Sequence, residues 1–267
     1  MSKLAYLARG TGLALLIVVV VWVKDYLGGV STKAVPDGKG GTDTSKIFNW
    51  HPVLMTLAFG VFMAEALMAY DAPILPSCSR EVRKKIHYSL HMCAVVLAAL
   101  GVWAAFASHN LKLPTPIPNL YSPHSFLGMA TVVLLALQFL VGLGAYLYPK
   151  ASLSQRTALG PFHKFVGRAV WCMGLAAMAT GIQEKTTFLQ AGKGLSGDAL
   201  FGAVIRLPGV ALLLLALLAC LVLFHQTPSK PQSAEGTDRD GLLQSLGQQH
   251  TRSDDWHQQQ RNGGLSA

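Results

Sequence analysis

Residues 202–224 read GAVIRLPGVALLLLALLACLVLF, an apolar stretch interrupted by one charged residue, Arg206. A helix of about 20 such residues covers the hydrocarbon core of a bilayer, so this stretch alone predicts a membrane span. Five similar stretches precede it, separated by polar or Pro/Gly-rich segments. The expected spans lie near residues 5–24, 51–70, 87–107, 124–148, 162–182 and 202–224. The sequence therefore predicts an all-α fold, a six-transmembrane-helix bundle over residues 1–224.

The composition of the 267-residue chain agrees with a membrane protein, since 51% of its residues are hydrophobic and 13% are charged. Soluble domains carry about 25% charged residues. The net charge of +9 is spread over loops and tail, so we ascribe it to topology and contact with the lipid bilayer and expect no nucleic-acid partner. The four cysteines are scattered and form no CxxC, so we expect neither a disulfide framework nor a zinc site.

The two ends of the chain differ from its apolar middle. The first span resembles a signal peptide, but it is long and lacks a clean cleavage site, so we expect a retained helix. Residues 225–267 are rich in Gln, Ser, Gly and Asp and cannot bury enough apolar surface to fold, so we expect a disordered tail. Lys and Arg near the spans are modestly enriched on the side of the N-terminus, which predicts cytosolic N- and C-termini.

Four histidines, His51, His87, His124 and His163, stand at the starts of four consecutive spans. Because successive helices enter from opposite faces, His51 and His124 share one depth and His87 and His163 share the opposite depth. This pairing does not depend on which side is cytosolic. Neutral imidazole is a good axial ligand for haem iron, and a helical bundle supplies an apolar slot for the porphyrin. The two pairs therefore indicate two haem b groups, one in each leaflet.

Other uses of these histidines remain open on this argument. A single His at a helix end is commonly an interfacial residue whose polar edge reaches water. A zinc site or a proton relay is a competing use, although no Cys, Asp or second His clusters tightly around each pair. His91 lies four residues after His87 on the same helical face, so geometry alone leaves either residue as the ligand.

Six short strings carry these histidines and their surroundings: FNWHPVLM (48–55), EALMAY (65–70), KKIHYSLH (84–91), YSPHSF (121–126), GPFHKF (160–165) and TGIQEKTTFLQ (180–190). In this order they resemble the cytochrome b561 family of ascorbate-dependent transmembrane reductases, over about residues 5–224. The resemblance implies that His87, not His91, is the ligand, and that the His51/His124 haem faces the non-cytosolic side. It also implies a homodimer and electron flow from cytosolic ascorbate to monodehydroascorbate or a ferric chelate.

The resemblance further implies cytosolic ascorbate contacts at Arg80, Lys84 and Arg156, with Tyr146 nearby. Ascorbate is a monoanion at pH 7, so fixed cations and hydrogen-bond donors suit its site. The same cations are also what an ordinary cytosolic loop carries.

On the opposite face, His109, Asn119 and Tyr121 stand shortly before His124, and the matching His and Tyr line the outer substrate pocket in the family. Histidine as a residue type can take up or release a proton near neutral pH, so His109 is a candidate acceptor of the ascorbyl proton and joins Lys84 as a candidate catalytic residue. Glu65 places a carboxylate inside the second span. Ionisable residues inside a membrane commonly have a function, and the role of Glu65 stays open.

The leading interpretation is an enzyme, an ascorbate-dependent transmembrane oxidoreductase in an endomembrane (vacuolar or vesicular) or the plasma membrane. The rival is a haem-free transporter or channel that uses the histidines as a proton relay. A transporter commonly shows internal repeats and broken helices, and no convincing repeat is present.

Overall fold

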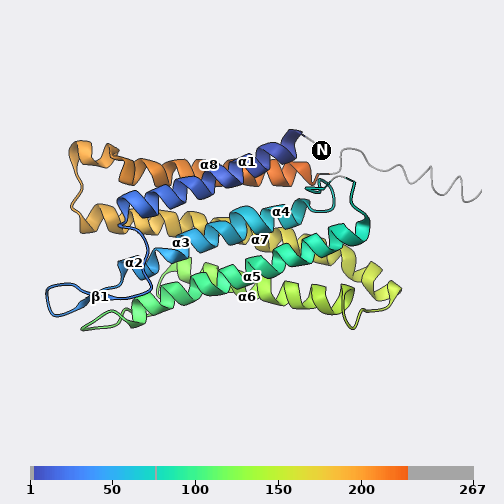
Figure 1. Ribbon diagram of the computed structural model, residues 1–267, viewed down its shortest axis with the longest axis horizontal. Coiled ribbons are helices and arrows are strands. Elements are labelled where there is room, and N and C mark those ends of the chain that lie inside the picture. The colour runs from blue at the N-terminus through green and yellow to red at the C-terminus, as the bar shows by residue number, and fades with distance from the viewer. Residues whose placement is uncertain (1–2, 76, 228–267) are drawn as a thin grey trace, which may run out of the picture. The chain divides into compact units, whose positions relative to one another are not determined.

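The computed structural model describes residues 3–75 and 77–227, and within these ranges six helical segments are long and apolar enough to cross a membrane. They are Lys3–Tyr26, Ser45–Met68, Arg80–Asn110, Pro123–Tyr146, Leu153–Gly192 and Gly197–His225. The predicted six-helix, all-α architecture is thus confirmed (Figure 1). The bundle belongs to the first of two units, residues 1–226. The predicted tail lies outside the described residues from residue 228 onward.

Several spans are built from more than one element. The elements are α1 (Lys3–Val21), η1 (Trp22–Tyr26), β1 (Val35–Pro36), β2 (Thr42–Asp43), α2 (Ser45–Phe48), α3 (Trp50–Met55), η2 (Thr56–Met63), α4 (Ala64–Met68), α5 (Arg80–Asn110), α6 (Pro123–Tyr146), α7 (Leu153–Gly192), η3 (Gly197–Phe201) and α8 (Ala203–His225). The antiparallel pair β1–β2, in the loop after the first span, was not predicted.

The helices form three layers. The first and last helices, α1 and α8, run side by side on one side of the bundle, and α5 and α6 lie on the opposite side (Figure 1). The elements α3, α4 and α7 lie between them. The four predicted ligand histidines lie in spans two to five. Helices α1 and α8 pack against these four spans from one side.

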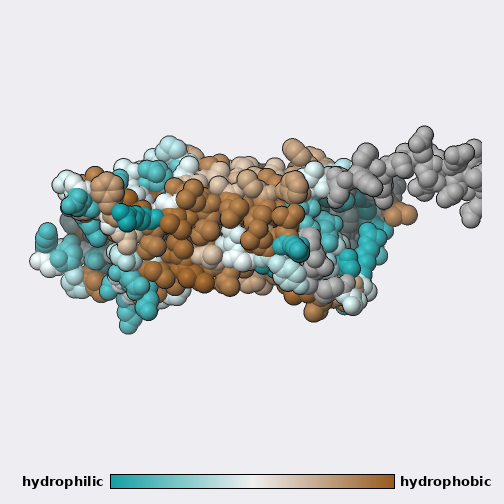
Figure 2. Space-filling model, turned by 90° about the horizontal axis from the view of Figure 1, so that it is seen from above, coloured by the Kyte–Doolittle hydropathy of each residue, from teal (hydrophilic) through white to brown (hydrophobic). Residues whose placement is uncertain are grey.

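The outer face of the bundle carries an apolar belt (Figure 2). Large side chains such as Leu137, Leu140 and Leu213 are exposed on α6 and α8. The face seen in Figure 2 is hydrophobic in its middle and hydrophilic at both ends. A wide apolar surface of this kind is unfavourable in water and favourable in lipid, so it supports a bilayer as the surroundings.

Polar caps start the helices on which three of the histidines lie. Ser79 accepts a hydrogen bond from the Val82 amide before α5. Ser122 and Ser152 form capping boxes before α6 and α7, which satisfy amides that have no partner inside the helix. Helices α5 and α7 begin at Arg80 and Leu153, so His87 and His163 lie well inside them, not at their ends as expected.

The second span is irregular in its middle, where η2 is a π-helical segment. A π-helix shifts the phase of the residues after it and leaves backbone groups outside the usual ladder. The Trp171 indole donates to the freed Phe59 carbonyl over 2.9 Å. Gly12 of α1 approaches so closely that a Cβ there would stand 2.7 Å from the Gly60 carbonyl oxygen. These contacts hold η2 between α1 and α7 and so orient α4.

Candidate functional site

The first histidine pair, His51 of α3 and His124 of α6, faces across the bundle interior with ring centroids 6.0 Å apart and planes at 81°. Each ring contacts a backbone carbonyl through Nδ1, at 2.9 Å from Gly101 of α5 for His51 and at 2.9 Å from Ala177 of α7 for His124. A carbonyl only accepts, so both Nδ1 atoms donate and both Nε2 atoms keep a free lone pair for a metal.

The second histidine pair, His87 of α5 and His163 of α7, has ring centroids 6.4 Å apart and planes at 65°. His87 Nδ1 donates to the Ala66 carbonyl of α4 over 2.8 Å. His163 differs from the other three, because its Nδ1 lies 3.0 Å from the side-chain amide of Gln138. Gln138 Nε2 also donates to the His163 carbonyl over 2.6 Å.

His91 lies next to the second pair rather than in it. Its ring stands edge-on to His87 with centroids 4.6 Å apart, one turn further along α5. The ring that faces His163 with its Nδ1 held by a carbonyl is His87. The geometry therefore favours His87 over His91 as the partner of His163.

Both pairs fit a metal ion held between two imidazoles. Metal–imidazole bonds are about 2.0–2.1 Å long, which puts two rings on opposite sides of one ion about 6 Å apart, centre to centre. Glycines make room for the rings: a Cβ on Gly181 would stand 2.6 Å from His124 Cε1, and one on Gly142 would stand 3.1 Å from His163 Cε1. Within residues 3–75 and 77–227 no group of three or more His, Cys, Asp or Glu could hold a metal ion. Two ligands per ion leave the remaining positions to a porphyrin, so the residues fit haem.

A cavity of about 410 Å³ contains the first pair and extends to one end of the bundle. Its polar lining includes His109 and Tyr121, which the sequence singled out, and Lys112, Glu184 and Lys185, which it did not. These residues join the two histidines of the pair in one cavity.

The three residues expected at this end lie together. His109 Nδ1 is 3.1 Å from Asn119 Oδ1, and the His109 and Tyr121 rings are 6.0 Å apart. Burial raises the pKa of the Tyr121 hydroxyl, and the Glu184 carboxylate adds to this shift. Lys185 lies over the Phe48 ring at 4.9 Å, so the cavity also holds a cation.

Two tyrosines flank the second pair. The Tyr70 ring lies 5.4 Å from His87, and the Tyr146 ring lies 5.4 Å from His163. The Tyr146 hydroxyl donates to the Arg156 carbonyl over 3.2 Å, so α6 and the first turns of α7 are joined beside the ring. Tyr146 was expected here, whereas Tyr70 had been quoted only inside a matching string.

The expected cations gather at the same end. Arg83 donates to the Tyr70 carbonyl over 2.9 Å. Burial raises the pKa of the Tyr70 hydroxyl, while the positive charge of Arg80 acts in the opposite direction, which places Arg80 near that ring. Lys84 is half-buried on α5 one turn before His87, and Arg156 donates to the Ala151 carbonyl over 3.1 Å. The structure thus brings the four predicted donor-site residues to the end that holds the second pair.

Comparison with known proteins agrees with these two sites. Residues 50–189, which contain all four histidines, match the family model described as eukaryotic cytochrome b561. A probable ascorbate-specific transmembrane electron transporter 2 of Oryza sativa subsp. japonica is 36% identical over 236 residues, covering 88% of this chain and 93% of that protein. A transmembrane ascorbate ferrireductase 2 of Arabidopsis thaliana is 34% identical over 78% of this chain and 84% of that protein. A plasma membrane ascorbate-dependent reductase of Xenopus laevis is 38% identical over 57% of this chain and 53% of that protein. With the family model matched across both histidine pairs and relatives aligned over most of the chain, the protein belongs to the cytochrome b561 family.

Proposed function

We propose that this protein carries single electrons across a membrane, from ascorbate at the end of the second pair to an acceptor at the end of the first pair, through two b-type haems. The observation that carries the proposal is the presence of two facing imidazole pairs, at 6.0 and 6.4 Å, in one bundle. The relatives named as ascorbate-dependent reductases and transporters support the donor. A haem-free transporter is not favoured, because membership of this family implies b-type haem.

The chain supplies ligation, orientation and exclusion of water, while each haem iron, when bound, takes up and passes on one electron at a time. The residues that would hold the haem irons are His51 with His124 and His87 with His163. The carbonyls that accept from Nδ1 keep three of these rings turned with Nε2 inward, and such outer partners also raise the basicity of the ligand.

Gln138→Leu tests this orienting role at His163. The leucine keeps the volume but removes the amide that contacts Nδ1 and the carbonyl of His163. We expect haem at the second pair to bind more weakly, because the His163 ring loses the amide that fixes its orientation, while the first pair is unchanged. Haem content and the reduced spectrum measure this. Gln183→Leu removes an exposed amide on α7 and is the matched control; equal haem loss in both variants would contradict the role.

The donor site would bind the ascorbate monoanion with Arg80, Lys84 and Arg156. Tyr146 holds the Arg156 backbone beside His163, so an anion bound there lies near the second pair. We propose that the ammonium group of Lys84, half-buried one turn before His87, attracts the ascorbate monoanion and holds it at this face while it is oxidised. The proton that ascorbate releases with its electron passes to water.

Arg156→Gln is expected to raise the KM for ascorbate about tenfold or more, since a hydrogen bond to a charged group contributes about 1.5–3 kcal/mol. Both haems should remain, because Arg156 is not a ligand. Rapid-mixing measurement of haem reduction against ascorbate concentration gives KM and maximal rate separately. Arg168→Gln, which removes a cation on the same helix, is the control; an unchanged KM in Arg156→Gln would remove Arg156 from the site.

The acceptor site would be the cavity of the first pair, with His109 and Tyr121 of its lining as substrate contacts. Asn119 is outside the lining but lies 3.1 Å from His109 Nδ1, and we propose it as the third contact. Monodehydroascorbate and a ferric chelate are the two candidate acceptors, and both are anions or carry anionic groups that Lys112 and Lys185 would attract. His109 is the group we propose to exchange the proton that accompanies the electron.

His109→Ala is expected to slow reduction of monodehydroascorbate more than reduction of a ferric chelate, because only the former gains a proton with its electron. Loss of a general acid or base usually lowers the reaction rate about 10²-fold or more. Rates are measured on fully reduced protein mixed with each acceptor. Unchanged rates with both haems intact would contradict the proposed role.

We also propose an orientation in the membrane, an oligomeric state and a cellular location. Arg80, Arg83, Lys84 and Lys85 open α5 at the end of the second pair, so that end would face the cytosol, as would both termini. We further propose a homodimer, in an endomembrane or the plasma membrane.

The absorption spectrum of the purified protein tests the function most simply. We expect haem bands in the visible range that sharpen when ascorbate is added to oxidised protein. A colourless protein, or one whose bands do not respond to ascorbate, would end this proposal.

A further inference from the structure

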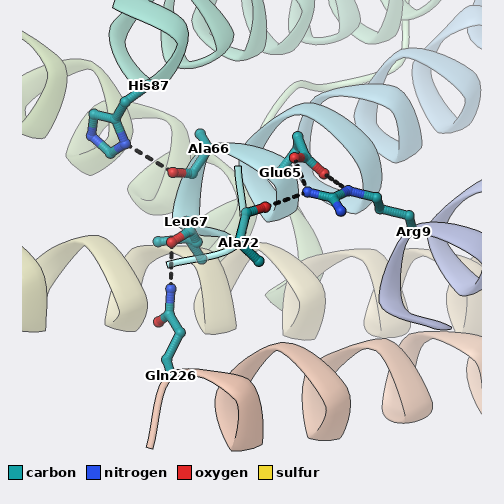
Figure 3. A network of polar contacts seen from close by, with 7 residues as sticks. All are labelled: Arg9, Glu65, Ala66, Leu67, Ala72, His87 and Gln226. Carbon is teal, nitrogen blue, oxygen red and sulfur yellow. Dashed lines mark hydrogen bonds and ion pairs between the residues drawn. The ribbon is translucent and has the colours of Figure 1, made fainter. Parts of the chain in front are cut away.

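The C-terminal turn of α4 is the place where the second histidine pair meets the peripheral helices (Figure 3). The last carbonyls of a helix have no partner within it and accept from outside. Here the Ala66 carbonyl accepts from His87 Nδ1 over 2.8 Å. The next carbonyl, that of Leu67, accepts from the Gln226 amide just after α8, over 2.6 Å. Two helices thus hold neighbouring carbonyls of the same turn.

Glu65, whose role the sequence left open, fastens the same turn to α1. Arg9 makes a bidentate contact with it through one edge of the guanidinium, Nε donating to Oε2 over 2.8 Å and Nη2 to Oε1 over 2.6 Å. The Arg9 Nη2 atom also donates to the Ala72 carbonyl beyond α4, over 2.6 Å. Glu65 is only 8% exposed. An ion pair this far from water adds little net stability, because desolvation opposes the attraction, but it specifies geometry.

The α4 turn depends on contacts from other helices more than the carbonyl partners of His51 and His124 do. Helix α4 is the last 5 residues of the span Ser45–Met68 and follows the π-helical segment η2, so its carbonyls lie at a helix end, where few partners within the helix remain. The acceptors of His51 and His124, by contrast, are Gly101 and Ala177, inside the long helices α5 and α7. A shift of α4 therefore moves the partner of His87 and leaves the first pair alone.

We propose that Arg9, Glu65 and Gln226 form a clamp on α4 that holds the Ala66 carbonyl against His87 and thereby sets how firmly, and in what ring orientation, the second pair holds its haem. This α4 clamp rests on the proposed function in that it requires haem at the second pair. Its members are positioning residues: each acts through α4 and the Ala66 carbonyl. The clamp also gives α1 and α8, which hold no ligand, a part in the redox centre.

The test uses the full-length protein in detergent with four variants: Gln226→Leu, Glu65→Gln, Arg9→Lys and the double variant Arg9→Gln/Glu65→Gln. Paramagnetic resonance of the oxidised protein reports the two low-spin ferric centres separately, and His51→Ala identifies which signal belongs to the second pair. Haem content per chain is measured beside it. Leu15→Ala is the control, because it opens a cavity at a buried position of α1, next to Gly60 of η2, and removes none of the hydrogen bonds to α4.

We expect the clamp variants to shift and broaden the signal of the second pair and to weaken haem binding there about 10–100-fold, as loss of an outer partner of a metal ligand does. The signal shift and the loss of haem affinity in Arg9→Lys should lie between those of the wild type and Glu65→Gln. Lysine keeps the positive charge but cannot make the bidentate contact of the guanidinium. The signal of the first pair should not move. Leu15→Ala should lower the unfolding temperature with both signals unchanged.

A second-pair signal identical to wild type in Gln226→Leu and in the double variant would overturn the clamp. So would an equal shift in Leu15→Ala, which would reduce the effect to general destabilisation. Should Glu65→Gln fail to fold because the Arg9 charge loses the Glu65 carboxylate, the double variant, which removes both charges, and Gln226→Leu still test the clamp. Wild-type protein without haem would instead refute the proposed function itself.

Discussion

The His87→Ala variant is expected to lose the haem of the second pair and to keep that of the first. His87 and His163 face each other at 6.4 Å, and a single remaining imidazole cannot hold iron from both sides. Because the cations of the proposed donor site lie at this end, ascorbate should no longer reduce the protein rapidly. The His51→Ala variant should do the opposite: it loses the first haem and is still reduced by ascorbate. Haem content, paramagnetic resonance and stopped-flow reduction measure all three properties.

The neighbouring histidine supplies the control for this experiment. His91 stands one turn along α5 with its ring 4.6 Å from His87, so it is the residue most able to replace it. His91→Ala should keep both haems. Retention of both haems in His87→Ala together with loss of one in His91→Ala would transfer the ligand assignment to His91.

Replacing Gly181 with valine is expected to remove the haem of the first pair without touching a ligand. A Cβ at this position would stand 2.6 Å from Cε1 and 3.0 Å from Nδ1 of His124, closer than real Cβ contacts. The ring must then turn away from the Ala177 carbonyl and from His51, and overpacking of this kind costs about 1–3 kcal/mol even when the structure adjusts. Haem content and the resonance signal of the first pair measure the loss.

A graded series makes this prediction sharper. Gly142→Ala, whose Cβ would stand 3.1 Å from His163 Cε1, should weaken the second pair to a smaller extent. Gly209→Ala, on α8, meets nothing within 4 Å and should leave both centres unchanged. Full haem occupancy in Gly181→Val would contradict the view that glycine at this position makes room for the ligand.

The spans and the depth of the histidines could be predicted from the sequence because both depend on local patterns. An apolar run such as 202–224 implies a membrane helix by length alone, and alternation of helix direction brings His51 to the depth of His124. The exact helix starts could not be predicted, since Ser79 and Ser152 begin α5 and α7 well before the apolar residues do. The π-helical segment η2 had no recognisable signal in an apolar run.

The contacts around the rings depend on side chains far apart in the chain, which is why the sequence did not reveal them. Arg9 and Glu65 are 56 residues apart, and their pairing depends on the rotation of α4 after η2. Gln138 was the one amide in the span 124–148, a signal that could have marked it, yet its target on α7 follows only from the packing of α6 on α7. Gly181 lay in a matching string, but its closeness to His124 needs coordinates.

Electron transfer across a sealed membrane tests the central claim most directly. Purified protein is reconstituted into liposomes that enclose ascorbate, and an impermeant ferric chelate is added outside. We expect reduction of the external chelate in vesicles with the wild-type protein, and background rates with His87→Ala, with His51→Ala and in vesicles without enclosed ascorbate. Background rates with haem-loaded wild-type protein, or wild-type rates in both histidine variants, would contradict electron transfer through the two histidine pairs.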